Sequence, residues 1–212
     1  MTNRSPDERR VPVAKRDPLT WGNAEAAKEP PTGFLRGAAI FYGVLAMIGG
    51  FFAHRTAVAR ETPDWILGPD PLVSLGVGLL LGVLFVLLSR MLEAVGSVRE
   101  LMSGFAEVLG PLTPLQCLGL AVASSLGEEM VFRGALQPVL GLVWTSLLFG
   151  LCHVPFERRF LAWPLLAILA GFGFGLVAER TGSILAPFIA HAWINGWNLR
   201  RISQTVSSSN LS

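Results

Sequence analysis

Apolar stretches about as long as a membrane span constrain this chain more than any other feature. Residues 71–91 and 160–178, for example, contain a single charged side chain between them. A helix needs about 20 apolar residues to cross a hydrocarbon core of ~30 Å. Of the 212 residues, 51% are hydrophobic and only 15% are charged, whereas a soluble domain has roughly 25% charged residues. The surplus apolar surface therefore predicts an integral membrane protein.

The pattern predicts an all-α, polytopic membrane fold with about six transmembrane helices and one interfacial amphipathic helix. The transmembrane helices are expected at 34–53, at 71–91, from Thr113 into the pair Glu128-Glu129, at 142–153, at 160–178 and at 184–199. Thr113 is a suitable N-cap because Pro114 follows it. Residues 92–110 mix charged and apolar side chains, which is typical of a helix at the membrane interface. Gly78 and Gly82 are spaced for close helix packing.

One integral membrane domain is expected over residues 34–202, between two disordered tails. The N-terminal tail, residues 1–33, is polar and rich in proline, a composition that cannot bury enough apolar surface to fold. The C-terminal tail is expected over residues 203–212. Thirteen of the 17 Lys and Arg residues fall on one side of the predicted helices. The positive-inside rule therefore predicts that both termini are cytoplasmic, and we expect a bacterial inner (plasma) membrane.

Three charged side chains interrupt the third apolar stretch within six positions: Glu128, Glu129 and Arg133. A charge near the bilayer centre costs about 3 kcal/mol on insertion scales, so we expect these residues to have a function. Glu129 and Arg133 are four residues apart and can form an ion pair on one helical face. Glu128 points about 100° away and lacks a local partner, which leaves it free to act as a general base or acid. The alternative is a purely structural ion-pair cluster.

Two histidines lie in later apolar helices. Phe149 and His153 are one helical turn apart, and so are His191 and Asn195. Taken alone, either pair is compatible with a core histidine or with helix–helix hydrogen bonding. Together with Glu128 they supply a base, two imidazoles and an amide that can hold an oxyanion. These groups are the equipment needed to attack a carbonyl with water.

Three short motifs in this order resemble those of the CPBP family, which comprises the CAAX prenyl protease and bacteriocin-processing (Abi) membrane endopeptidases. The motifs are Glu128-Glu129-x-x-x-Arg133, Phe149-x-x-x-His153 and His191-x-x-x-Asn195, and the resemblance covers about residues 113–200. It implies an intramembrane endopeptidase with an α-helical core and places the protease motifs within the membrane domain.

The resemblance also implies a role for each motif residue. Glu128 would activate the water with help from His153, and His191 and Asn195 would form the oxyanion site. The pair of Glu129 and its arginine would be structural or would orient Glu128. The substrate would be a membrane protein or peptide, lipidated ones included.

The same residues leave a metal site open. Glu128, His153 and His191 together would be a zinc ligand set. However, the chain lacks a His-Glu-x-x-His helix that would place two ligands and a base together. A glutamate-dependent reaction without a cofactor is therefore favoured over a metallopeptidase, and zinc is the alternative.

Other functions remain open as well. A non-catalytic scaffold or immunity protein of the same fold is one alternative, and a proton-coupled transporter is another. Cys152 beside His153 is a weak thiol-protease signal, because neighbouring helical positions point about 100° apart. The net charge of +2 gives no reason to expect nucleic acid.

The side of the membrane on which the site opens bears on the substrate. CAAX processing requires a cytosolic substrate, but the predicted topology places Glu128 toward the outer side. A site that faces outward would suit removal of a C-terminal sorting signal or maturation of an exported peptide.

Overall fold

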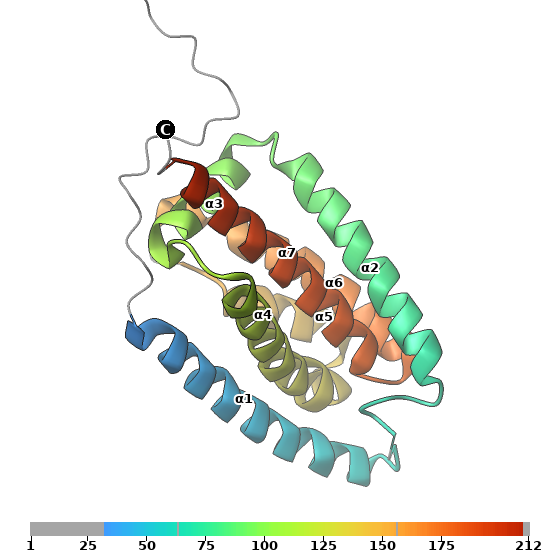
Figure 1. Ribbon diagram of the computed structural model, residues 1–212. Coiled ribbons are helices and arrows are strands. Elements are labelled where there is room, and N and C mark those ends of the chain that lie inside the picture. The colour runs from blue at the N-terminus through green and yellow to red at the C-terminus, as the bar shows by residue number, and fades with distance from the viewer. Residues whose placement is uncertain (1–31, 63, 156, 210–212) are drawn as a thin grey trace, which may run out of the picture.

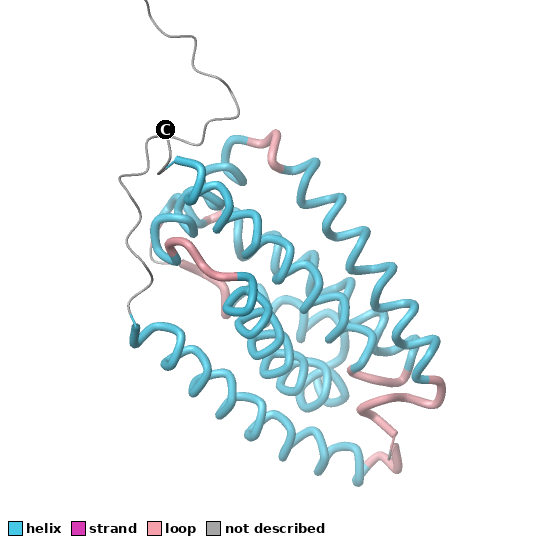
Figure 2. Tube along the Cα trace, viewed as in Figure 1, coloured by secondary structure: helices cyan, strands magenta, loops and turns pink. Residues whose placement is uncertain are grey.

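The computed structural model describes residues 32–62, 64–155 and 157–209. Within these residues the chain forms a bundle of helices and has no strand (Figures 1 and 2). The predicted all-α fold is therefore confirmed. The N-terminal tail predicted over residues 1–33 lies outside the described residues, apart from its last two positions, where the first helix has already begun.

Each of the six expected transmembrane helices has a counterpart. In chain order the elements are α1 (Thr32–Ala59), α2 (Pro71–Leu92), α3 (Gly96–Leu109), α4 (Pro114–Glu129), the π-helix η2 (Met130–Leu136), α5 (Gln137–Leu151), the 3₁₀-helix η3 (Arg158–Phe160), α6 (Ala162–Thr181) and α7 (Leu185–Ser209). The helix α3 corresponds to the amphipathic helix predicted over residues 92–110.

By length and composition, four helical stretches of the described chain could cross a bilayer. They are Gly33–Ala59, Pro71–Leu92, Pro114–Leu151 and Arg158–Thr181. The third stretch contains two of the predicted helices. Gly141, at φ 77° and ψ 170°, breaks the helical path between them. The last predicted helix, α7, is more polar than these four, since it carries His191, Asn195 and two arginines.

The C-terminal tail differs from the prediction. The helix α7 continues to Ser209, so residues 203–209 are helical where a disordered tail was expected. The Ser203 hydroxyl donates to Leu199 O at 2.8 Å and accepts from the N–H of Leu112 at 3.2 Å. Ile202 beside it is buried. These contacts with the segment before α4 extend the helix beyond its apolar part.

Local sequence explains where two of the helices begin. The Asp70 carboxylate accepts hydrogen bonds from Leu72 N and Val73 N, both at 3.1 Å, and so caps α2. Thr113 caps α4 as predicted, in a reciprocal capping box with Gln116. Such caps satisfy backbone N–H groups that have no partner inside the helix. They are especially useful where a helix end approaches the membrane.

The helices α4 and α7 lie side by side within the bundle (Figure 1). The helix α1 packs against α4 and η2, α2 packs against α7, and α5 and α6 pack against each other. A Cβ at Gly78 in α2 would lie 2.5 Å from Ala186 O and 2.9 Å from Ile189 Cβ of α7. At Gly82 it would lie 3.0 Å from Trp193 Cβ. Both glycines therefore permit the close helix packing that their spacing predicted.

We expect Gly78→Ala to lower the thermal stability of the protein, because the new methyl group would overlap the α7 backbone. Overpacking of this kind typically costs about 1–3 kcal/mol. Gly76 is the matched control, since it lies in the same helix and a Cβ there meets nothing within 4 Å. Thermal unfolding in detergent should show a loss for Gly78→Ala and none for Gly76→Ala. Equal melting temperatures for the two variants would contradict the packing described here.

Candidate active site

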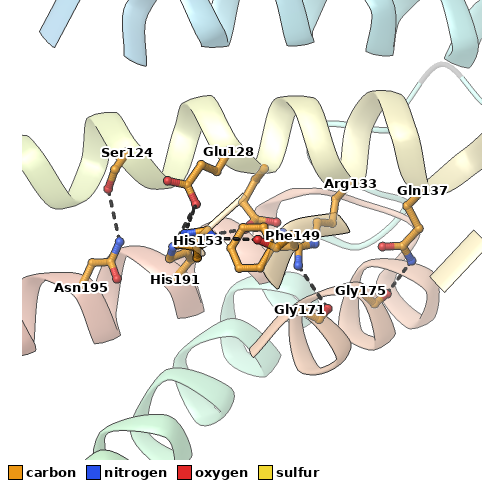
Figure 3. Close-up of polar contacts among 11 residues, drawn as sticks. Ser124, Glu128, Arg133, Gln137, Phe149, His153, Gly171, Gly175, His191 and Asn195 are labelled. Carbon is orange, nitrogen blue, oxygen red and sulfur yellow. Dashed lines mark hydrogen bonds and ion pairs between the residues drawn. The ribbon is translucent and has the colours of Figure 1, made fainter. Parts of the chain in front are cut away.

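Four polar side chains form a row along α4, η2 and the start of α5: Ser124, Glu128, Arg133 and Gln137 (Figure 3). Five residues of a regular α-helix would rotate Arg133 about 140° away from Glu128. Here the N–H of Gln137 donates to Phe132 O, five residues earlier, as in a π-helix. The wider turn accommodates one extra residue. It thereby brings Arg133 and Gln137 to the same side as Glu128.

The Glu129 carboxylate is completely buried and joins two helices. Its Oε1 atom lies 3.1 Å from Arg133 Nη1 and 2.7 Å from His191 Nδ1. The ion pair expected from the four-residue spacing is therefore present. The contact with His191 was not foreseen, because the sequence analysis offered only a structural role or the orientation of Glu128. Glu129 instead holds the imidazole of His191.

Arg133 lies among aromatic rings and backbone oxygens. Its Nη2 atom donates to Gly171 O at 3.1 Å, and its Cζ atom lies 4.5 Å from the ring centre of Phe149 and 5.3 Å from that of Phe174. A guanidinium over aromatic faces gains cation–π attraction, most of all when it is desolvated. The carboxylate of Glu129 supplies the compensating charge that a buried arginine requires.

Gln137 continues this attachment to α6. Its Nε2 atom donates to Gly175 O at 2.9 Å and to Glu179 Oε1 at 3.1 Å. A Cβ at Gly175 would lie 2.7 Å from Gln137 Oε1, so a glycine allows the side chain to reach the helix backbone. Sequence reasoning did not identify Gln137. Its only signal was a polar residue in a long apolar stretch.

Glu128 faces both histidines. Its Oε2 atom lies 3.8 Å from His153 Nε2 and 3.8 Å from His191 Nε2. This oxygen is buried and makes no hydrogen bond with the described residues. The Nδ1 atom of His153 lies 2.6 Å from Phe149 O, and that of His191 faces Glu129. Because these neighbours only accept hydrogen bonds, both Nδ1 atoms carry a hydrogen. Each imidazole is thereby held with its Nε2 atom toward Glu128.

Asn195 completes the group one turn along α7 from His191. Its Nδ2 atom donates to the Ser124 hydroxyl at 3.2 Å (Figure 3). All six residues predicted for the site therefore meet where α4, η2, α5 and α7 converge. Sequence reasoning missed Ser124 and also Phe174, whose ring stacks on the imidazole of His191 with 4.7 Å between centroids and 21° between planes. Ser124 precedes Glu128 by four residues, a spacing that could have indicated it.

The site lies within a segment that matches a known family. Residues 110–197 match the model of the type II CAAX prenyl endopeptidase Rce1-like family. The family resemblance inferred from the three motifs is thereby confirmed, and the Rce1-like segment contains every residue of the site described above.

One relative among curated proteins is the uncharacterized protein YpbD of Bacillus subtilis (strain 168). It is 35% identical to the chain over 72 residues, which are 34% of this chain and 38% of the relative. The similarity therefore spans well under half the length of either protein. No solved structure matches the chain.

We expect Glu129→Gln to destabilise the protein strongly, because it would leave the buried Arg133 guanidinium without its counter-charge. Breaking a buried pair in this way costs about 3–5 kcal/mol. The control is Glu107→Gln, which removes the partner of Arg159 from a largely exposed pair that is worth about 0–1 kcal/mol. Folded yield and melting temperature in detergent would measure both. If Glu129→Gln were as stable as the wild type, the ion pair would not support the bundle.

Proposed function

We propose that this protein is an intramembrane endopeptidase that hydrolyses a peptide bond in a membrane-associated protein or peptide. The observation that carries the proposal is the position of Glu128, whose Oε2 atom lies 3.8 Å from the Nε2 atoms of both His153 and His191. This separation is too long for a hydrogen bond but suits a water molecule that bridges the groups. The match to a family of endopeptidases supports the same reaction class.

In the proposed reaction, Glu128 takes a proton from the bridging water. The water oxygen forms a bond to the substrate carbonyl carbon, and the electron pair of the C=O double bond moves to its oxygen. The electron pair on the oxyanion then re-forms the C=O bond as the C–N bond breaks, and the proton passes through Glu128 and His153 to the leaving nitrogen. These transfers balance without any further reactant.

The oxyanion of the tetrahedral intermediate needs hydrogen-bond donors on the side opposite the attacking water. The carboxylate of Glu129 contacts His191 Nδ1 at 2.7 Å, so it holds the imidazole with Nε2 toward the site, and an Nε2–H in that position donates to the oxyanion. The amide of Asn195 supplies a second donor. Donors placed in advance at a developing negative charge are worth about 10²–10³ in rate each.

We further propose that the reaction uses no metal ion, in keeping with the absence of a His-Glu-x-x-His helix from the sequence. The competing view makes Glu128, His153 and His191 zinc ligands. The hydrogen bonds at both Nδ1 atoms are of a kind that also orients metal-bound imidazoles. A chelator experiment therefore has to separate the two views.

The substrate is proposed to approach from the end of the bundle that holds both termini of the described chain (Figure 1). The helix α5 stops at Leu151, and Val154, just beyond His153, is exposed. The chain then continues to η3, which packs against α3. If both termini are cytoplasmic, a cytosolic CAAX-type substrate fits this approach. This approach differs from the outward-facing site suggested by charge counting, because it starts from His153, just beyond the end of α5 at Leu151, and not from the opposite end of α5 near Gly141.

We expect Glu128→Gln to keep the protein folded and to lower cleavage by at least ~10²-fold, since it preserves the shape of the side chain and removes the base. The assay is cleavage of a fluorogenic farnesylated CAAX peptide by purified protein, beside the same peptide without the lipid. Glu100→Gln, at an exposed glutamate of α3, is the matched control. Equal activity of the wild type and Glu128→Gln would end the protease proposal.

The same assay with a strong chelator tests the metal-free reaction. Activity should persist after chelation. Loss of activity that added zinc restores would instead make Glu128, His153 and His191 ligands, and would reassign their roles.

Reporter fusions test the proposed orientation. A reporter joined after Ser212 is expected on the cytoplasmic side, and one joined after Thr62, beyond the end of α1, on the outside. The physical reason is the excess of arginines at the end of the bundle where α7 finishes. The reverse pattern would place the segment after His153 outside the cell and would favour an exported substrate.

A further inference from the structure

Ser124 is buried, with 6% of its surface exposed, and its hydroxyl has two partners. It donates to Ala121 O in its own helix at 3.2 Å, and it accepts from Asn195 Nδ2 at 3.2 Å. A serine hydroxyl has one hydrogen, and the backbone carbonyl uses it. Only lone pairs of Ser124 therefore face Asn195.

This arrangement determines which end of the Asn195 amide faces α4. An asparagine amide can present either its NH₂ group or its carbonyl oxygen, and the surrounding hydrogen bonds decide between them. The lone pairs of Ser124 accept from NH₂ and would repel the carbonyl oxygen. One amide hydrogen is thus held by Ser124, and the second remains available to another acceptor.

The contact also sets the spacing of the site. Ser124 and Glu128 are one turn apart in α4, and Asn195 and His191 are one turn apart in α7, so the two helices meet in two successive pairs (Figure 3). The hydrogen bond between Ser124 and Asn195 lies beside the contact between Glu128 and His191. It therefore fixes the separation of α4 and α7 next to the base.

We propose that Ser124 is a positioning residue that holds the Asn195 amide with its NH₂ group toward the reacting carbonyl oxygen. The proposal rests on the endopeptidase function given above. Ser124 itself touches no reacting atom and acts only through Asn195. Without the hydroxyl, the amide can rotate and present its oxygen, which repels an oxyanion.

The test compares Ser124→Ala with Ser125→Ala in the farnesylated-peptide assay. Ser125 is the matched control, because it is the neighbouring serine, is completely buried, and its hydroxyl has no hydrogen-bond partner among the described residues. Ser124→Ala should lower kcat about 10-fold to 100-fold with little change in KM, up to the loss typical of one oxyanion donor. Ser125→Ala should keep kcat near the wild-type value. Ser124→Thr, which retains the hydroxyl, should recover most of the rate.

A double-mutant cycle shows whether the effect passes through Asn195. If it does, adding Ser124→Ala to Asn195→Ala should cause little further loss. Multiplicative losses, or an unchanged kcat in Ser124→Ala, would overturn the proposal while Glu128→Gln remained inactive and the protease function stood. A wild-type protein no more active than Glu128→Gln would overturn both. Melting temperatures near that of the wild type for all serine variants would show that the kcat changes are not caused by unfolding.

Discussion

The fully buried carboxylate of Glu129 is the group on which the rest of the site depends. It compensates the Arg133 guanidinium and holds His191 through the same oxygen atom. In a medium of low dielectric constant, neither the arginine nor the glutamate would be tolerated without the other. The contact between Glu129 and His191 thereby connects the helix that carries Glu128 to the helix that carries the second histidine. The aromatic rings around Arg133 exclude water and strengthen both contacts.

The π-helix gives this ion pair its place in the bundle. It directs Arg133 and Gln137 toward α6, where they donate to the carbonyl oxygens of Gly171 and Gly175, four residues apart. A helix backbone can accept such bonds only where side chains do not cover it, and the glycine at 175 provides that access. Polar residues in the membrane are thus satisfied by backbone groups of a neighbouring helix. Single-turn π-helices are frequent at functional sites, and here the turn follows directly after the two glutamates.

The geometry divides the two adjacent glutamates between two tasks. Glu129 is enclosed by its partners, whereas Glu128 retains a buried oxygen that faces two imidazoles at 3.8 Å. Residues that follow one another in a helix point about 100° apart, so Glu129 can support the bundle while its neighbour Glu128 faces the two histidines. The orientation of each imidazole is set by what its Nδ1 atom contacts. A backbone carbonyl holds His153, and the carboxylate of Glu129 holds His191.

The sequence by itself determined the helices, the Thr113 cap and the pairing of Glu129 with Arg133. These features depend on contacts between residues a few positions apart, which helical periodicity makes predictable. Only the tertiary structure decided that Glu129 holds His191, that Ser124 holds Asn195 and that Gln137 reaches α6. Such contacts depend on which helices pack together and how each is rotated about its axis. The π-helix changes that rotation after Glu129, and Gly141 turns α5 back toward the site, so a regular 3.6-residue period could not have revealed these contacts.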